Sequence, residues 1–215
     1  MRNNFLSLVW LILCLGVTNV AAMTMQHNGM TMDDEGMIMG ENTSNLPKDC
    51  PKISEEINLT IHAGHEHAQK YPGKMFAFDQ QEWKVPGCSK INLTFVNDDH
   101  IRHQLMVHGL PGYLYRDGML TIEIYGPGKK TASLIVSSDP KTYMVHCEVP
   151  QHMEKGMKGQ LKVAGGDGDL PSIPGVSDPI KFDRYLINWN GQTWAVLCIA
   201  ILVGASGYWL LKKWL

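Results

Sequence analysis

Hydrophobic and polar positions alternate most clearly in the central part of the chain. Ile91, Leu93 and Phe95 alternate with Asn92 and Thr94, which is the two-residue period of a strand with one buried face. Similar short runs, rich in β-branched and aromatic residues, are separated by Gly, Pro, Asn and Asp residues that favour turns. We predict strands at residues 57–63, 74–80, 89–98, 103–109, 119–126, 131–138, 141–147 and 159–165. Short strands at this spacing predict an antiparallel sandwich or barrel over residues 50–164.

Two long apolar runs lie outside this domain. Residues 1–22 have a basic start, an apolar core and small residues at the end, which is typical of a secretory signal peptide. The alternative is an uncleaved N-terminal anchor. Residues 193–211 are long enough to span a bilayer and carry Trp and Tyr at both ends. A buried helix of a soluble domain is the alternative there, but it would not explain the aromatic residues.

Charge after the second apolar run predicts the orientation of the protein. Lys212 and Lys213 lie in the short tail 212–215, and positive residues favour the cytoplasmic side. We therefore expect a single-pass protein of the cell membrane whose domain lies on the periplasmic or extracellular side. The formal net charge of −2 gives no basic surface, so nucleic acid is not an expected partner.

Two polar segments flank the predicted domain. Residues 23–49 are rich in Met, Asn, Gly and acidic residues without hydrophobic periodicity, and we predict that they are disordered. Residues 165–192 are rich in Gly, Pro and Asp, which predicts a linker between the domain and the membrane span.

One short segment carries three side chains that suit a redox-active metal. Cys147, His152 and Met157 follow one another at intervals of five residues between two predicted strands. Thiolate and imidazole in a trigonal plane, with a weak thioether on the axis, suit copper. Zinc is the rival metal, but it prefers tetrahedral sites with more thiolate or imidazole ligands. A trigonal copper site needs one more histidine, and residues 97–104 contain candidates.

The segment that begins at Cys147 has the pattern C-x-x-P-x-H-x-x-x-G-M-x-G and is followed by a hydrophobic strand. Upstream, Phe95-Val96-Asn97 runs into a histidine about six residues later. With these two features the chain resembles the cupredoxins, the plastocyanin and azurin class of type 1 copper proteins, over roughly residues 55–164. The resemblance implies an all-β, Greek-key β-sandwich with one copper ion held at one end. The ligands that it implies are His103, Cys147, His152 and Met157.

The choice of His103 rests on position and strand parity. It lies six residues after Asn97, where the family's first ligand is usual, and it shares its strand face with Leu105. His100 and His108 remain the alternatives. Gln104 stands where the family commonly has asparagine, which puts in doubt the usual hydrogen bond between the two ligand loops.

The cysteine count is compatible with this site. Cys147 as a metal ligand leaves Cys50 and Cys88 to pair in an oxidising compartment. Their disulfide would stabilise the fold by about 3–4 kcal/mol on the chain-entropy estimate. Two unpaired thiols are the alternative.

A single copper ion with four protein ligands has no open position for a substrate. We therefore predict one-electron transfer to a redox protein partner through a small, transient contact, and no enzymatic activity. A copper oxidase would need a second copper centre.

Further soft or borderline donors gather outside the predicted centre. The methionine-rich segment suits additional Cu(I), and a histidine cluster suits Cu(II). These candidates are Met23, Met25, His27, Met30, Met32, Met37, Met39, His62, His65 and His67. The methionines could instead be a tolerated linker or an oxidant sink, and the histidines a polar strand end. If they do bind metal, the protein is alternatively a copper-handling or resistance protein that captures copper outside the cytoplasm.

Overall fold

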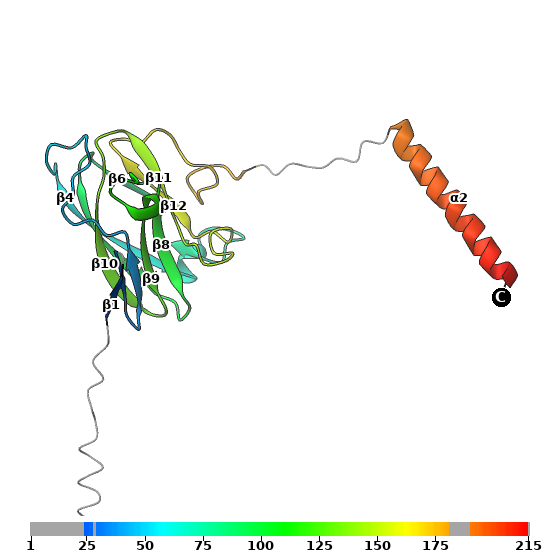
Figure 1. The fold of residues 1–215 in the computed structure, drawn as a ribbon, viewed down its shortest axis with the longest axis horizontal. Coiled ribbons are helices and arrows are strands. Elements are labelled where there is room, and N and C mark those ends of the chain that lie inside the picture. Colours follow the sequence, from blue (N-terminus) through cyan, green and yellow to red (C-terminus); the bar gives the residue numbers. More distant parts are fainter. Residues whose placement is uncertain (1–23, 28, 181–189, 215) are drawn as a thin grey trace, which may run out of the picture. The chain divides into compact units, whose positions relative to one another are not determined.

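The structure, a computed structural model, describes residues 24–27, 29–180 and 190–214. Its contacts divide the chain into two units, Met1–Pro179 and Ile180–Leu215. The described part of the first unit forms twelve strands in two sheets, and that of the second contains one helix, α2 (Figure 1). The predicted signal peptide, residues 1–22, lies outside the described residues.

The two sheets pack as a sandwich. The larger sheet has the strand order β1-β2-β3-β9-β8-β11-β12-β6, and the smaller has the order β10-β7-β4-β5. Pairing is antiparallel except for β12 with β6 and β4 with β7. The strands and short helical turns are β1 (Met25–His27), β2 (Met30–Met32), β3 (Gly36–Met39), β4 (Glu56–Gly64), η1 (Glu66–Ala68), β5 (Ala77–Phe78), β6 (Glu82–Val85), β7 (Lys90–Asn97), β8 (His103–His108), η2 (Arg116–Gly118), β9 (Met119–Ile124), β10 (Gly128–Ile135), β11 (Lys141–His146) and β12 (Lys158–Val163).

The hydrophobic alternation decides which face of each strand is buried. In β7, Ile91, Leu93 and Phe95 are at most 2% exposed, whereas the residues between them are half-buried. These side chains join one core cluster with residues from the larger sheet. The predicted all-β sandwich is therefore confirmed. Strand β6 was not predicted, because only Trp83 and Val85 mark its buried side over four residues.

The prediction of disorder over residues 23–49 is wrong for residues 25–27 and 29–39. These residues contain β1, β2 and β3, and β3 pairs with the edge of β9 from Gly36 to Met39. Ile38 packs against the core, and Asp33 forms an ion pair with Lys130 at 2.6 Å. Backbone hydrogen bonds to an existing sheet edge stabilise this segment, and composition alone does not reveal that edge.

The prediction of a simple linker over residues 165–192 is wrong for its first half. Asp167 accepts the backbone N–H of Thr142 at 2.8 Å, and Asp169 accepts from the side-chain amide of Gln160 at 2.7 Å. Ile173 is fully buried. This part of the segment therefore packs on the sandwich, while residues 181–189 lie outside the described residues.

The disulfide between Cys50 and Cys88 is present, as predicted, and joins residues 38 positions apart. Cys147 is a free, buried thiol, which leaves it available as a metal ligand.

Helix α2 (Gly191–Trp214) is long and apolar enough to cross a membrane. Asn190 caps its start, since its side-chain oxygen accepts the backbone N–H of Thr193 at 3.0 Å. None of its described side chains is buried. Its length and apolar composition fit the predicted membrane anchor.

Candidate metal centre

The loop between β11 and β12 brings the two ends of the motif together. The backbone N–H of Cys147 donates to the carbonyl oxygen of Met157 at 3.1 Å, and that of Met157 donates to His152 at 2.9 Å. Gly156 has a φ of +119°, and a Cβ there would lie 2.8 Å from the carbonyl oxygen of Phe76. The glycine is therefore required for the close approach of this loop to the segment before β5.

His103, the first residue of β8, faces the interior as its strand parity predicts. His103 and Leu105 are both fully buried. By contrast, His100 is exposed in the preceding bend. His108 stacks its ring on that of His146, with centroids 5.0 Å apart. Of the three upstream candidates, His103 is the one that the fold directs toward the loop.

Three predicted ligands converge. His103, Cys147 and His152 each place one ligand atom within 4.8 Å of the other two. Nδ1 of His103 lies 3.0 Å from Nδ1 of His152, which lies 3.5 Å from Sγ of Cys147. Two nitrogens bound at roughly 2.0 Å in a trigonal plane would lie roughly 3.5 Å apart. The donor set thus fits copper after a small outward shift of the histidine rings.

Met157 completes the predicted set at the end of the loop. It is fully buried and belongs to the core cluster. That position suits a weak axial thioether. Its role as a ligand stays a prediction.

Asp99 orients His103, and sequence reasoning missed it. Nε2 of His103 donates to Oδ2 of Asp99 at 2.7 Å, which leaves Nδ1 unprotonated on the side of Cys147 and His152. Metal-bound histidines typically have such a carboxylate partner on the other ring nitrogen. The spacing of four residues between Asp99 and His103 is the sequence signal that could have found this pair.

Phe76 also belongs to the centre, although no motif marks it. Its ring stacks on His152 with centroids 4.3 Å apart and meets His103 edge-on at 5.4 Å. It therefore covers both imidazoles with an apolar surface.

Gln104 does not link the ligand loops through its side chain, which bonds to Glu123 instead. Its backbone N–H donates to Sγ of Cys147 at 3.3 Å and provides the connection between β8 and the loop.

Burial sets the protonation of the centre. It lowers the pKa of His103, against the opposing effect of Asp99, and it lowers the pKa of His152 together with the neighbouring His103. Both imidazoles are therefore neutral at neutral pH and can ligate a metal. Burial also raises the pKa of the Cys147 thiol to about 11. The hydrogen bond from the backbone N–H of Gln104 lowers this pKa, but by less than burial raises it. A cation must displace the thiol proton.

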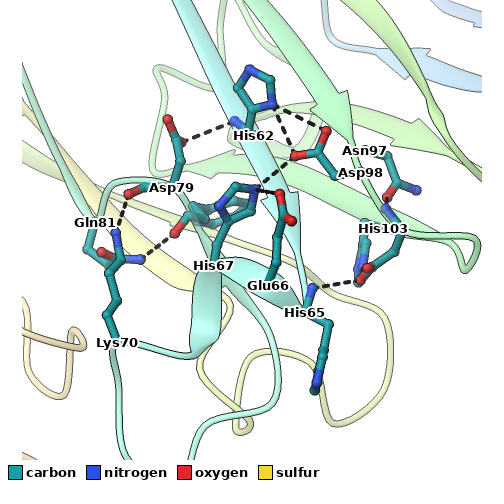
Figure 2. Close-up of polar contacts among 12 residues, drawn as sticks. His62, His65, Glu66, His67, Lys70, Asp79, Gln81, Asn97, Asp98 and His103 are labelled. Atoms are coloured by element: carbon teal, nitrogen blue, oxygen red, sulfur yellow. Dashed lines mark hydrogen bonds and ion pairs between the residues drawn. The ribbon is translucent and has the colours of Figure 1, made fainter.

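The structure brings together some of the secondary candidates. His62 and His67 lie beside Asp98 (Figure 2). Nδ1 of His65 instead faces the carbonyl oxygen of Met75 at 2.7 Å. The methionines Met25, Met30, Met32, Met37 and Met39 occupy strands β1 to β3. Met23 and the side chain of His27 lie outside the described residues.

A family model described as multicopper oxidase matches residues 51–167, more than half of the 215-residue chain. The chain belongs to the multicopper oxidase family. The match contains β4 to β12 and the entire loop from Cys147 to Met157. This member of the family is a cupredoxin-like protein, and copper is its cofactor.

Several solved structures resemble part of this family member. Auracyanin from the photosynthetic bacterium Roseiflexus castenholzii is 23% identical, with a TM-score of 0.37 over 51% of this chain and 96% of that chain. Auracyanin A, a blue copper protein from Chloroflexus aurantiacus, is 21% identical, with a TM-score of 0.37 over 49% and 98%. A multicopper oxidase from Pseudomonas thermotolerans is 13% identical, with a TM-score of 0.38 over 50% and 29%. No curated protein matches the sequence.

Proposed function

We propose that the protein is a membrane-tethered one-electron carrier in which His103, Cys147, His152 and Met157 hold one type 1 copper ion. The convergence of three ligand atoms within 4.8 Å carries this proposal. Bound copper supplies a one-electron couple between Cu(II) and Cu(I). The chain contributes ligands that β8, β11 and the loop hold in place before the metal binds.

Burial of the ligands favours electron transfer over catalysis. His103, Cys147 and Met157 are fully buried and His152 is 8% exposed. Four protein ligands in such a setting leave a small molecule no coordination position. Oxidase activity at this centre would need an open site, so we propose that the domain is not an enzyme.

The surface beside the copper loop supports contact with a redox protein. Pro150 is exposed and Met153 is half-buried, and both lie within a few residues of His152. Transient redox contacts are small, below roughly 1,200 Å². These two apolar side chains next to a ligand histidine are compatible with such a contact.

Orientation in the membrane follows from α2 and the disulfide. Lys212 and Lys213 lie in the last turn of α2, which favours a cytoplasmic C-terminus. The Cys50–Cys88 bond requires an oxidising compartment on the other side. Protease added outside intact cells or spheroplasts should degrade the domain and spare a C-terminal tag. Protection of the domain would contradict this orientation.

Spectroscopy of the full chain in detergent tests the copper centre. With one equivalent of Cu(II), we expect intense absorption toward the red end of the visible spectrum, a type 1 EPR signal and reversible voltammetry. Cys147→Ala should abolish all three. Cys198→Ala removes the second free cysteine of the described residues, which is exposed on α2, and should change none of them. A colourless wild type, or substrate turnover by it, would contradict the proposal.

The methionine-rich strands support a second candidate function, copper capture. Pairing places Met25 opposite Met32, Met32 opposite Met37, and Met30 opposite Met39. Directly opposite residues of antiparallel strands project to the same face, and so do alternate residues of one strand. All five thioethers therefore share one face, which we call the methionine face, and Met25 is 67% exposed there.

This face continues across the larger sheet as far as His146. Met39 lies opposite Thr121, Thr121 opposite Met106, and Met106 opposite His146, the residue before Cys147. Thioethers are soft donors that prefer Cu(I). Met106 and His146 alternate with Leu105 and Cys147, so the methionine face lies on the opposite side of the sheet from the buried centre and favours capture of Cu(I) there.

Replacement of Met30, Met32, Met37 and Met39 by Leu keeps size and apolar character but removes the sulfur donors. We expect the variant to lose at least one bound Cu(I) per chain in competition with a chromogenic chelator. Met75→Leu is the matched control, because Met75 is 44% exposed and lies outside the methionine face. Equal Cu(I) stoichiometry in wild type and the fourfold variant would exclude this function.

A further inference from the structure

Two histidines and one carboxylate converge at the end of β4, apart from the buried centre. Nδ1 of His62 lies 3.0 Å from Oδ2 of Asp98, and Nε2 of His67 lies 2.8 Å from the same oxygen. The three ligand atoms lie within 4.8 Å of one another. Figure 2 shows the two rings approaching the Asp98 carboxylate from different sides, while the ring of His65 points away.

The charges around this group favour a cation. Among the residues that the structure describes, Asp98 pairs with His62 and His67 and with no lysine or arginine. Glu66 adds a second carboxylate 3.6 Å from Nε2 of His67. The nearby Lys70 directs its ammonium group to the carbonyl oxygen of Asp79. Among the described residues, imidazoles are therefore the ion-pair partners of the Asp98 carboxylate.

The geometry is close to that of a bound metal. Ligands at roughly 2.0 Å from a tetrahedral ion would lie roughly 3.3 Å apart. The nitrogen–oxygen distances of 3.0 and 2.8 Å require only a small outward movement of His62 and His67. Their side chains are 42% and 18% exposed, so that an ion can enter from solvent and keep water ligands.

The donor types select the class of ion. Two imidazoles and a carboxylate suit borderline divalent ions such as Cu²⁺ and Zn²⁺, whereas Ca²⁺ and Mg²⁺ prefer oxygen ligands and Cu(I) prefers thioethers. Among the divalent ions of the first transition row, Cu²⁺ binds such sites most tightly.

We propose that His62, His67 and Asp98 form a second, solvent-accessible metal site that takes a borderline divalent cation, with Cu²⁺ preferred. The two sites share one chain segment, since Asp98 belongs to this site and the next residue, Asp99, bonds to His103 of the buried centre. A cation at Asp98 would therefore hold in place the segment that orients His103. This site does not depend on the proposed electron transfer.

The full chain in detergent, with the buried centre already filled by one copper ion, allows a direct test. We expect Zn²⁺ titrated into this protein to bind at one further site by calorimetry and metal analysis. A second equivalent of Cu²⁺ should give a new EPR signal with nitrogen couplings. His62→Ala and His67→Ala should each weaken binding of the second ion by roughly 10–100-fold or more. Loss of a residue that only supports a ligand already costs roughly that much.

His65→Ala is the matched control. His65 belongs to the same short histidine-rich segment and is exposed, but it lies outside the group of ligand atoms. The His65→Ala variant should bind the second ion with the same affinity as the wild type. The proposal is overturned if the wild type binds no second ion, or if His65→Ala loses binding as His62→Ala does. The red absorption reports the buried centre separately, so its absence would count against the proposed electron transfer and not against this site.

Discussion

Nδ1 of His103 and Nδ1 of His152 face each other at 3.0 Å in the buried centre. Such a contact needs one N–H donor and one acceptor. Since Nε2 of His103 donates to Asp99, His152 supplies the proton between the rings. A hydrogen bond thus joins the two nitrogens that would bind copper and holds the rings of His103 and His152 close together.

Copper uptake should release at least one proton near neutral pH. Cys147, whose pKa burial raises to about 11, is a thiol before the metal binds and a thiolate afterwards. The affinity should rise about tenfold per pH unit while one proton is displaced. Calorimetry in buffers of different ionisation enthalpy measures the number of protons. Uptake without proton release would show that Cys147 is not the ligand.

Asp99→Ala should weaken copper binding by roughly 10–100-fold, because His103 loses the partner that fixes its tautomer and orientation. A competition titration against a chelator of known affinity measures the change. The type 1 EPR signal should also broaden, which mere loss of stability would not cause. Asp117→Asn, an exposed carboxylate beside Arg116, provides the control. Unchanged affinity in Asp99→Ala would remove this residue from the centre.

Phe76→Leu should speed the loss of copper to an external chelator. The phenyl ring stacks on His152 at 4.3 Å and excludes water from both imidazoles, and leucine cannot replace that stacking. We expect roughly a tenfold faster loss, equivalent to about 1.4 kcal/mol. Leu114→Ala, a change in a side chain packed elsewhere against the core, tests whether general loosening has the same effect. Equal rates for Phe76→Leu and wild type would show that the ring does not shield the metal.

Glu82→Gln should reduce the fall in the free energy of unfolding as the pH drops from 4.5 toward about 2. Lys84, Lys162 and Gln160 bond to Glu82 and lower its pKa from 4.5 to about 2. Its folded pKa lies below its unfolded one, so its contribution is present above pH 4.5 and is lost as the pH falls toward about 2.

Urea unfolding of the copper-free protein across this range measures the effect. The variant should lose on the order of 1–2 kcal/mol at neutral pH, after allowance for solvent screening. Glu55→Gln, at an exposed position, should leave the pH dependence intact. If the free energy of unfolding of Glu82→Gln falls with acid as steeply as that of the wild type, the lowered pKa of Glu82 is contradicted.

Several features followed from the sequence because they depend on local spacing. Alternation in residues such as Ile91, Leu93 and Phe95 predicts a strand and its buried face, since side chains repeat every two residues. The same parity directs His103 inward with Leu105. The spacing from Cys147 to Met157 predicts a metal loop, and the length of the last apolar run predicts α2.

Other features were decided only by the tertiary structure, because they join segments far apart in the chain. Asp98 meets His62 and His67 only after β4 and β7 have paired, and Phe76 covers His152 only through the folded loop. The methionine-rich segment carries no signal of its own for a strand. It becomes ordered because β9 offers an unpaired edge whose backbone groups it can satisfy, and an edge of that kind exists only in the assembled sheet.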